Sequence, residues 1–201
     1  MPPQILEGFD VKELDELGNP VFAVDGDLTM VYANPAYFDF ARDNGGGSDF
    51  ADRWGIGCNI LEAMPANLES YFRKMFSLCL EQKAPWDHQF ECSSPERFRL
   101  FNQRVYPLGE RSGLVVLNSL VTEVRHDPAA RPPQTADPAV YCDDRGLVHQ
   151  CVQCRRILRQ GEAHEWDWVP AWVATPPPEV THGFCPVCLD FYYPRDEADQ
   201  D

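Results

Sequence analysis

The sequence has no long hydrophobic segment and no leader-like N-terminus. No apolar run approaches the roughly 18 residues that a membrane-spanning helix needs, and the stretch MPPQILEGFDVKELDEL lacks the basic and apolar regions of a secretory signal. We therefore expect a cytoplasmic protein with no membrane segment.

Basic residues are scarce relative to acidic ones. The chain has 17 Lys and Arg against 32 Asp and Glu, a formal net charge of −15. Binding to nucleic acids and to anionic membrane surfaces depends on Lys and Arg. We therefore expect no nucleic-acid partner and no membrane partner, and we interpret the excess acid as a source of solubility.

Recognisable catalytic patterns are also missing. The sequence shows no nucleophile–base pair, carboxylate dyad, kinase signature, phosphate-binding Gly–Lys loop or helix-turn-helix pattern. We expect that the protein is not an enzyme and that any output passes through another protein.

The first part of the chain predicts an α+β fold. The stretch 21-VFAVDGDLTMVYA-33 indicates a hairpin around an Asp-Gly turn. Residues 65–83 have the apolar spacing of a helix that buries one face. Three strand-like runs with short connections follow, at residues 86–92, 97–107 and 113–121. The prediction is a five-stranded antiparallel sheet with helices.

Residues 8–125 resemble the PAS sensory-domain family. The resemblance rests on NPVFAVDGDLTMVYANPAYFDFA, then GIGCNILEAMP, then GLVVLNSLVTEVR. It implies a curved sheet around a pocket that holds haem, flavin, a metabolite or nothing. It also implies a role in sensing or dimerisation, and the segment from Phe9 to Leu17 is a candidate helix for a homodimer interface.

The candidate pocket ligands can be narrowed residue by residue. Cys58 lies where the light-oxygen-voltage members of this family carry a reactive cysteine, but Asn59 replaces the Arg that grips the flavin phosphate. Haem-binding members usually have a histidine on the long helix, and residues 65–83 contain none. The residues thus argue against flavin and haem and leave the ligand unknown. We interpret Cys58 as a buried core residue and His88 as a polar residue on a solvated sheet face.

Composition changes after the PAS-like region. Residues 126–139, HDPAARPPQTADPA, predict a Pro-rich linker. Residues 140–194 predict a four-cysteine zinc-binding module, and residues 195–201 a disordered acidic tail. The aromatic runs 166–173 and 191–194 either fill the interior of this small module or form an exposed docking patch, and we favour the interior.

Two Cys-x-x-Cys pairs predict a metal site in this module. Each pair lets two thiolates approach one ion, and two pairs complete a tetrahedral site. The predicted ligands of a structural zinc ion are Cys151, Cys154, Cys185 and Cys188. Cys142 and His149 are spare ligands nearby. We interpret Cys142 as structural and His182 as a residue that packs beside the ligands or supports them.

Other chemistries of the cysteine pairs fit less well. Neither c-type haem attachment nor a thioredoxin-like motif has its required context. Rubredoxin-like iron uses similar turns, but usually with Gly after each pair, where this chain has Arg155 and Leu189. An iron or switching-thiol site would make the protein a redox sensor or electron carrier, which is the alternative hypothesis.

The complete pattern favours a signalling protein. The arrangement CVQCRRIL…WDWVPAWV…VTHGFCPVCLDFYYP resembles a cysteine module that follows PAS or response-regulator domains in bacterial signalling proteins. We expect a stand-alone bacterial signalling protein in which a PAS domain senses or dimerises and a zinc module contacts a protein partner.

Overall fold

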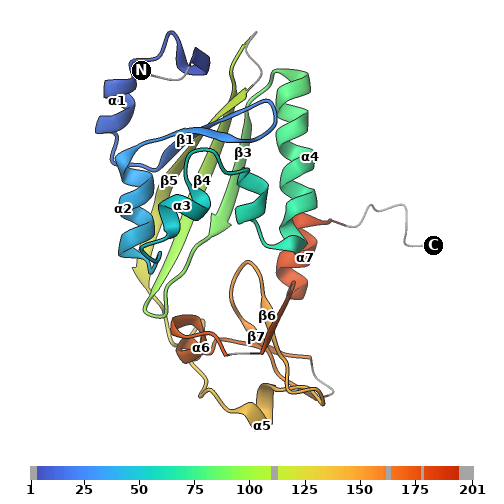
Figure 1. The fold of residues 1–201 in the computed structure, drawn as a ribbon. Coiled ribbons are helices and arrows are strands. Elements are labelled where there is room, and N and C mark those ends of the chain that lie inside the picture. Colours follow the sequence, from blue (N-terminus) through green and yellow to red (C-terminus); the bar gives the residue numbers. More distant parts are fainter. Residues whose placement is uncertain (1–3, 110–112, 162–163, 178, 195–201) are drawn as a thin grey trace, which may run out of the picture. The chain divides into compact units, whose positions relative to one another are not determined.

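The chain divides into two compact units in the computed structural model, which describes residues 4–109, 113–161, 164–177 and 179–194 (Figure 1). Unit 1 comprises Met1–Phe90 and Phe101–Val121, and unit 2 comprises Glu91–Leu100 and Thr122–Asp201. The predicted acidic tail, residues 195–201, lies outside the described residues.

The first sheet confirms the predicted α+β fold class. Its five strands have the order β2-β1-β5-β4-β3 and are antiparallel. Their bounds are β1 Val21–Asp25, β2 Met30–Ala33, β3 Trp86–Glu91, β4 Arg97–Pro107 and β5 Gly113–Arg125. The predicted hairpin joins β1 to β2, and the carboxylate of Asp25 closes its turn by accepting hydrogen bonds from the backbone of Asp27 and Thr29.

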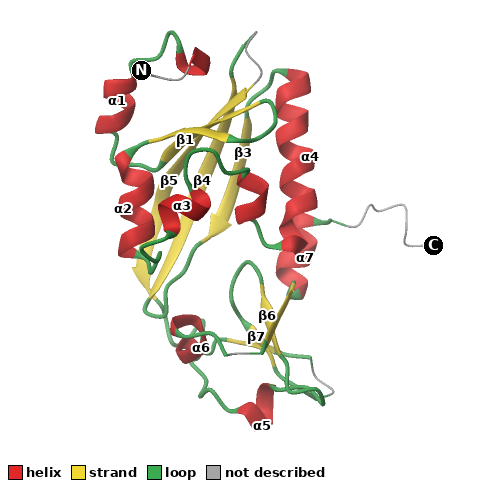
Figure 2. Ribbon diagram, in the orientation of Figure 1, coloured by secondary structure: helices red, strands yellow, loops and turns green. Residues whose placement is uncertain are grey.

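Helices accompany this sheet in unit 1 (Figure 2). They are α1 Val11–Glu16, α2 Pro35–Asp43, α3 Phe50–Trp54 and α4 Ala66–Gln82, with 3-10 turns η1 Gln4–Leu6 and η2 Ile60–Ala63. Helix α4 starts after Pro65, as predicted, and buries Leu68, Phe72, Phe76 and Cys79 on one face.

Strand β1 is buried on both sides, because each face of the sheet is covered. Phe22 contacts Tyr37 of α2 with its ring, whereas Val21 and Ala23 belong to a cluster that also receives Ile5, Val11 and Leu14 from the N-terminal segment. Residues next to one another in a strand point to opposite faces. Four consecutive residues, 21–24, are therefore buried.

Asn34 joins the segments that meet at the start of α2. Its side chain is fully buried. The Oδ1 atom accepts from the backbone N–H groups of Val21 and Tyr37, at 3.0 and 3.1 Å. The Nδ2 atom donates to a carbonyl oxygen of α1 and to two in the connection from α1 to β1. Asn34 is thus the N-cap of α2 and also bonds to the first residue of β1.

The structure corrects the interpretation of His88. It is 4% exposed, not solvated. Its ring stacks on Trp86 at 5.1 Å and contacts the rings of Tyr71 and Phe72 from α4. Alternation along β3 places residues 86, 88 and 90 on the same face, and that face packs against α4. The prediction that His88 lies in a strand is confirmed, but the prediction that it lies on the solvated face of the sheet is wrong.

Cys58 is also placed differently from the expectation. It is half-buried in the connection between α3 and η2, not in the core. The side chain of Asn59 is occupied by the turn: Nδ2 donates to the carbonyl of Asp27 at 2.8 Å and Oδ1 accepts from the backbone of Leu61 at 3.0 Å.

Unit 2 contains a second sheet with the order β8-β7-β6-β9. Its elements are β6 Val148–Cys151, β7 Ile157–Leu158, β8 Trp166–Asp167, β9 Val180–Gly183, α5 Pro138–Tyr141, α6 Pro170–Ala174 and α7 Pro186–Tyr192. Tyr141, Val148, Ile157 and Val169 form a small hydrophobic core. Trp168 and Val173 are buried as well, so the run 166–173 fills the interior, as favoured. For residues 191–194 the expectation is wrong in part: Tyr192 is buried, but Phe191 and Tyr193 are 57% and 38% exposed, because α7 buries one face and leaves the other in solvent.

Residues 126–139 make specific contacts within unit 2. His126 lies with its ring 4.5 Å from Trp168, Pro133 forms an isolated bridge with Trp168, and Gln134 donates to the Trp168 carbonyl at 2.8 Å. Both ends of this reach of the Pro-rich segment, residue 126 and residues 133–134, therefore pack against Trp168, which follows β8.

None of the helices within the described ranges combines the length and the apolar character that crossing a membrane requires.

The environment of His88 leads to a pH-dependent stability. Burial lowers the pKa of His88 from 6.5 to about 4, so between these values the unfolded chain binds a proton that the folded chain excludes. Stability is therefore lost as the pH falls below about 6.5. Between pH 7.5 and pH 5 we expect the free energy of unfolding to drop by about 2 kcal/mol from this group.

Urea unfolding at the two pH values measures this change. His88→Gln should remove most of it, whereas His182→Gln, at an exposed position, should keep it. The same pH dependence in wild type and His88→Gln would contradict the prediction.

Candidate metal centre

The four cysteines of the two Cys-x-x-Cys pairs meet in one cluster. The sulfur atoms of Cys151, Cys154, Cys185 and Cys188 all lie within 4.8 Å of one another, and the first three residues are buried. The sulfurs of Cys154 and Cys185 are 3.7 Å apart. A tetrahedral ion with metal–sulfur bonds of about 2.3 Å has sulfur–sulfur edges of about 3.8 Å. The donor set therefore fits a tetrahedral metal ion.

A tight β-hairpin positions the first pair. Cys151 is the last residue of β6, and Gln150 pairs with Ile157 of β7. The backbone of Arg155 donates to the carbonyl of Cys151 at 3.0 Å and has a φ of 60°. This left-handed conformation is the one for which Gly is preferred, so Arg155 turns the chain as a Gly would.

A parallel strand pair brings the second cysteine pair to the first. Strands β6 and β9 pair in register, with Cys151 opposite Gly183. Cys185 follows two residues later as the N-cap of α7, Pro186 begins the helix, and Cys188 lies in its first turn. The register of a strand pair thus joins cysteines that are more than thirty residues apart.

Proximity makes the protonation states of the four thiols interdependent. The pKa of Cys151 is lowered because the thiol of Cys154 donates to its sulfur, and the pKa of Cys154 is raised by the same interaction. A bound cation would allow every thiol to be deprotonated, since a coordinating thiol loses its proton outright. The cluster is therefore suited to a divalent or trivalent metal ion.

A polar network extends from the first cysteine turn to the end of β3. Gln153 donates through Nε2 to the carbonyl of Glu91 at 3.2 Å and accepts from the hydroxyl of Tyr192 at 2.8 Å. Arg131 forms a two-bond ion pair with the Glu91 carboxylate, at 2.7 and 3.1 Å. Their side chains are only 12% and 14% exposed, so the pair is largely removed from water.

Aromatic rings complete the surroundings of Arg131. Its guanidinium carbon lies 4.8 Å from the ring centre of Trp168 and 5.7 Å from that of Phe98. Both distances are typical of cation–π contacts. Sequence reasoning missed Glu91, Arg131 and Gln153, because no local pattern links positions separated by 40 and 62 residues.

The neighbouring cysteine and histidines lie outside the cluster. Cys142 forms an isolated bridge with Val148 and packs against the small core. The ring of His149 contacts the carboxylate of Asp143 at 3.0 Å. His182 is exposed in β9, opposite Gln150. Among the residues that the structure describes, only the four cysteines form a group of metal-ligating side chains.

No protein-family model and no curated protein matches the sequence. Solved structures that match the chain include PAS domains. The PAS domain of BvgS from Bordetella pertussis is 23% identical, with a TM-score of 0.46 over 60% of this chain and 88% of that one. The photoactive yellow protein domain of the sensor histidine kinase Ppr from Rhodospirillum centenum is 19% identical, with a TM-score of 0.39 over 58% of this chain and 97% of that one. The VqmA dimer of Vibrio cholerae is 18% identical, with a TM-score of 0.44 over 58% of this chain and 51% of that one.

Removing one cysteine of the cluster should release the metal and loosen unit 2. Residues 140–194 have only a small hydrophobic core, and structural metal contributes on the order of 10 kcal/mol to modules of this kind. We expect Cys185→Ser to lose metal, to become protease-sensitive in residues 140–194, and to lose amide protection in residues 91–100.

Two variants serve as controls for this experiment. Cys142→Ser, in the same unit, and Cys79→Ser, in α4, should both retain one metal ion per chain by native mass spectrometry. Stoichiometric metal in Cys185→Ser would show that the cluster is not the binding site.

Proposed function

We propose that this chain is a signalling protein in which unit 1 senses a small molecule and unit 2, held together by structural zinc, contacts a protein partner. The observation that carries the proposal is the course of β3. The strand bears His88 in the aromatic core of unit 1 and ends at Glu91, which Gln153 of the cysteine turn and Arg131 hold in unit 2. A change in β3 would thus reach the metal-binding turn directly.

A pair of amide side chains in the sheet supports the sensing role. Gln103 of β4 donates through Nε2 to Oδ1 of Asn118 on β5 at 3.1 Å. Gln103 is 7% exposed, and its buried Oε1 atom has no hydrogen-bond partner among the described residues. A buried acceptor without a partner costs roughly 1–3 kcal/mol. A small molecule with an N–H or O–H group at this position would satisfy it.

The shape of the two cysteine turns supports zinc over iron. The closed set of four cysteines fits either ion, so the turns have to distinguish them. The two turns are unlike each other: the first ends in the left-handed residue Arg155, and the second continues into helix α7, where Leu189 is helical. Zinc has no geometric preference that requires two equivalent turns.

Contact with a protein partner is supported by the surface of α7. Val187 is 71% exposed and Phe191, one turn later on the same helix face, is 57% exposed. Exposed apolar side chains in this arrangement are typical of interaction surfaces. We expect no catalysis by the chain itself.

Native mass spectrometry together with absorption spectroscopy tests this function. We expect one zinc ion per chain, no visible absorption, and a small molecule that co-purifies with the protein. Gln103→Leu should lose the small molecule and keep zinc, because the acceptor for its donor group is gone. Cys185→Ser should lose zinc.

Two results would argue against the proposal. A coloured protein whose visible band disappears in Cys185→Ser would favour the iron-containing electron carrier. A small molecule that Gln103→Leu binds as well as wild type would place sensing elsewhere.

A further inference from the structure

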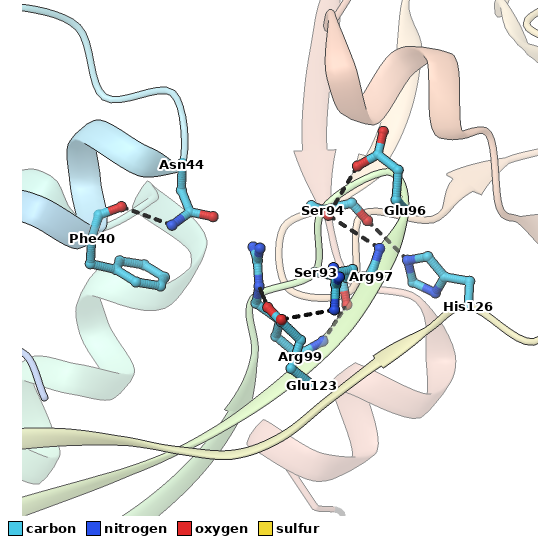
Figure 3. Close-up of polar contacts among 9 residues, drawn as sticks. All are labelled: Phe40, Asn44, Ser93, Ser94, Glu96, Arg97, Arg99, Glu123 and His126. Atoms are coloured by element: carbon cyan, nitrogen blue, oxygen red, sulfur yellow. Dashed lines mark hydrogen bonds and ion pairs between the residues drawn. The ribbon is translucent and has the colours of Figure 1, made fainter. Parts of the chain in front are cut away.

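A hollow in unit 2 is lined by arginines, although the chain as a whole is acidic. Its volume is about 360 Å³, and its lining residues are Ser94, Glu96, Arg97, Arg99 and Arg125. This volume lies at the lower end of the range of small-molecule sites, roughly 300–1,000 Å³. Figure 3 shows the two strands that form it, with Arg97 and Arg99 on one and Glu123 on the other.

Strand alternation explains why these side chains gather. Arg97 and Arg99 are two residues apart on β4, and Glu123 and Arg125 are two residues apart on β5. Residues two apart in a strand point to the same face. The neighbouring strands therefore present three arginines and one glutamate side by side.

Glu123 is shared between two of the arginines. Its Oε1 lies 3.0 Å from Nη1 of Arg97, and its Oε2 lies 2.5 Å from Nε of Arg99. Arg99 is only 16% exposed. No carboxylate in the described parts of the chain pairs with Arg125. One carboxylate thus serves two guanidinium groups, and the third guanidinium has none.

The charges of the hollow leave a positive excess. The three arginines face two carboxylates: Glu96, which lines the hollow, and Glu123, which pairs with Arg97. The net charge of these five side chains is +1, whereas the net charge of the whole chain is −15. The remaining polar groups are engaged: Ser94 accepts from the backbone of Arg97 at 3.2 Å and donates to Glu96 at 3.3 Å. Among the described residues, the positive charge without a carboxylate partner therefore belongs to Arg125.

From this arrangement we infer that the hollow is a binding site for the oxyanion group of a small metabolite, either a phosphate ester or a carboxylate. The planar guanidinium fork matches two oxygens of such a group. Arg125 supplies a positive charge that no carboxylate of the described chain pairs. Arg97 and Arg99 supply N–H donors that bond to the Glu123 carboxylate in this structure. Glu123 acts as an internal competitor for the ligand. The site is separate from the amide pair in the sheet and does not depend on the proposed function.

NMR titration of the arginine Nε–H signals with inorganic phosphate, and separately with acetate, at constant ionic strength tests the site. We expect saturable shifts in wild type and about tenfold weaker binding in Arg125→Gln, which breaks no ion pair of the described chain. Glu123→Gln should bind several-fold more tightly, because the competing carboxylate is gone. Arg73→Gln, which removes a positive charge from the Glu69 ion pair on α4, should leave the affinity unchanged.

The outcomes separate a binding site from a structural ion-pair cluster. Saturation by phosphate alone identifies a phosphate ester as the ligand group, saturation by acetate alone identifies a carboxylate, and both support the oxyanion site. Absence of saturable shifts, or equal affinity in wild type and Arg125→Gln, would overturn the inference. The amide spectrum of Arg125→Gln shows whether unit 2 is still folded.

Discussion

Unit 2 depends on one constraint, that four sulfur atoms lie within 4.8 Å of one another. Four thiols at this distance cannot all be ionised without a cation, and a bound metal ion would resolve this while linking four points of the chain. The register of β6 and β9, the left-handed turn at Arg155 and the start of α7 at Pro186 all serve to bring these sulfurs together. A module with so small a hydrophobic core gains its rigidity from such a link.

The buried ion pair between Arg131 and Glu91 has a different role. Removing two charges from water costs as much as their attraction returns, so a buried pair is a weak source of stability. It does select one arrangement, because either partner alone would remain as an uncompensated charge. Stacked near Trp168 and bonded twice to Glu91, Arg131 holds the β3–β4 connection against the cysteine module in a single geometry.

Unit 1 buries polar groups where a purely structural sheet would bury apolar ones. His88 lies among aromatic rings with a pKa lowered by desolvation, and the buried Oε1 atom of Gln103 has no hydrogen-bond partner within the described ranges. Both cost stability. Such costs are commonly retained at sites that bind or respond, since the missing partner can be supplied by a ligand.

The sequence by itself determined the features that local patterns encode. Alternating and helical periodicities identified the strands of the first sheet, α4 and the α+β class, and the spacing of Cys151, Cys154, Cys185 and Cys188 singled out the residues that the structure brings together. These predictions succeeded because each strand, each helix and each Cys-x-x-Cys pair is defined by neighbours within one turn or one strand, and because two such pairs complete one tetrahedral site.

Only the tertiary structure decided the rest. The face on which His88 lies depends on which side of β3 receives α4, and periodicity alone leaves that choice open. The contacts of Glu91 with Arg131 and Gln153 join positions 40 and 62 residues apart. The arginine hollow exists because β4 and β5 pair in one register, and a shift of one residue would point Glu123 and Arg125 to the opposite face. Charges distant in sequence become a site only when strand pairing brings them together.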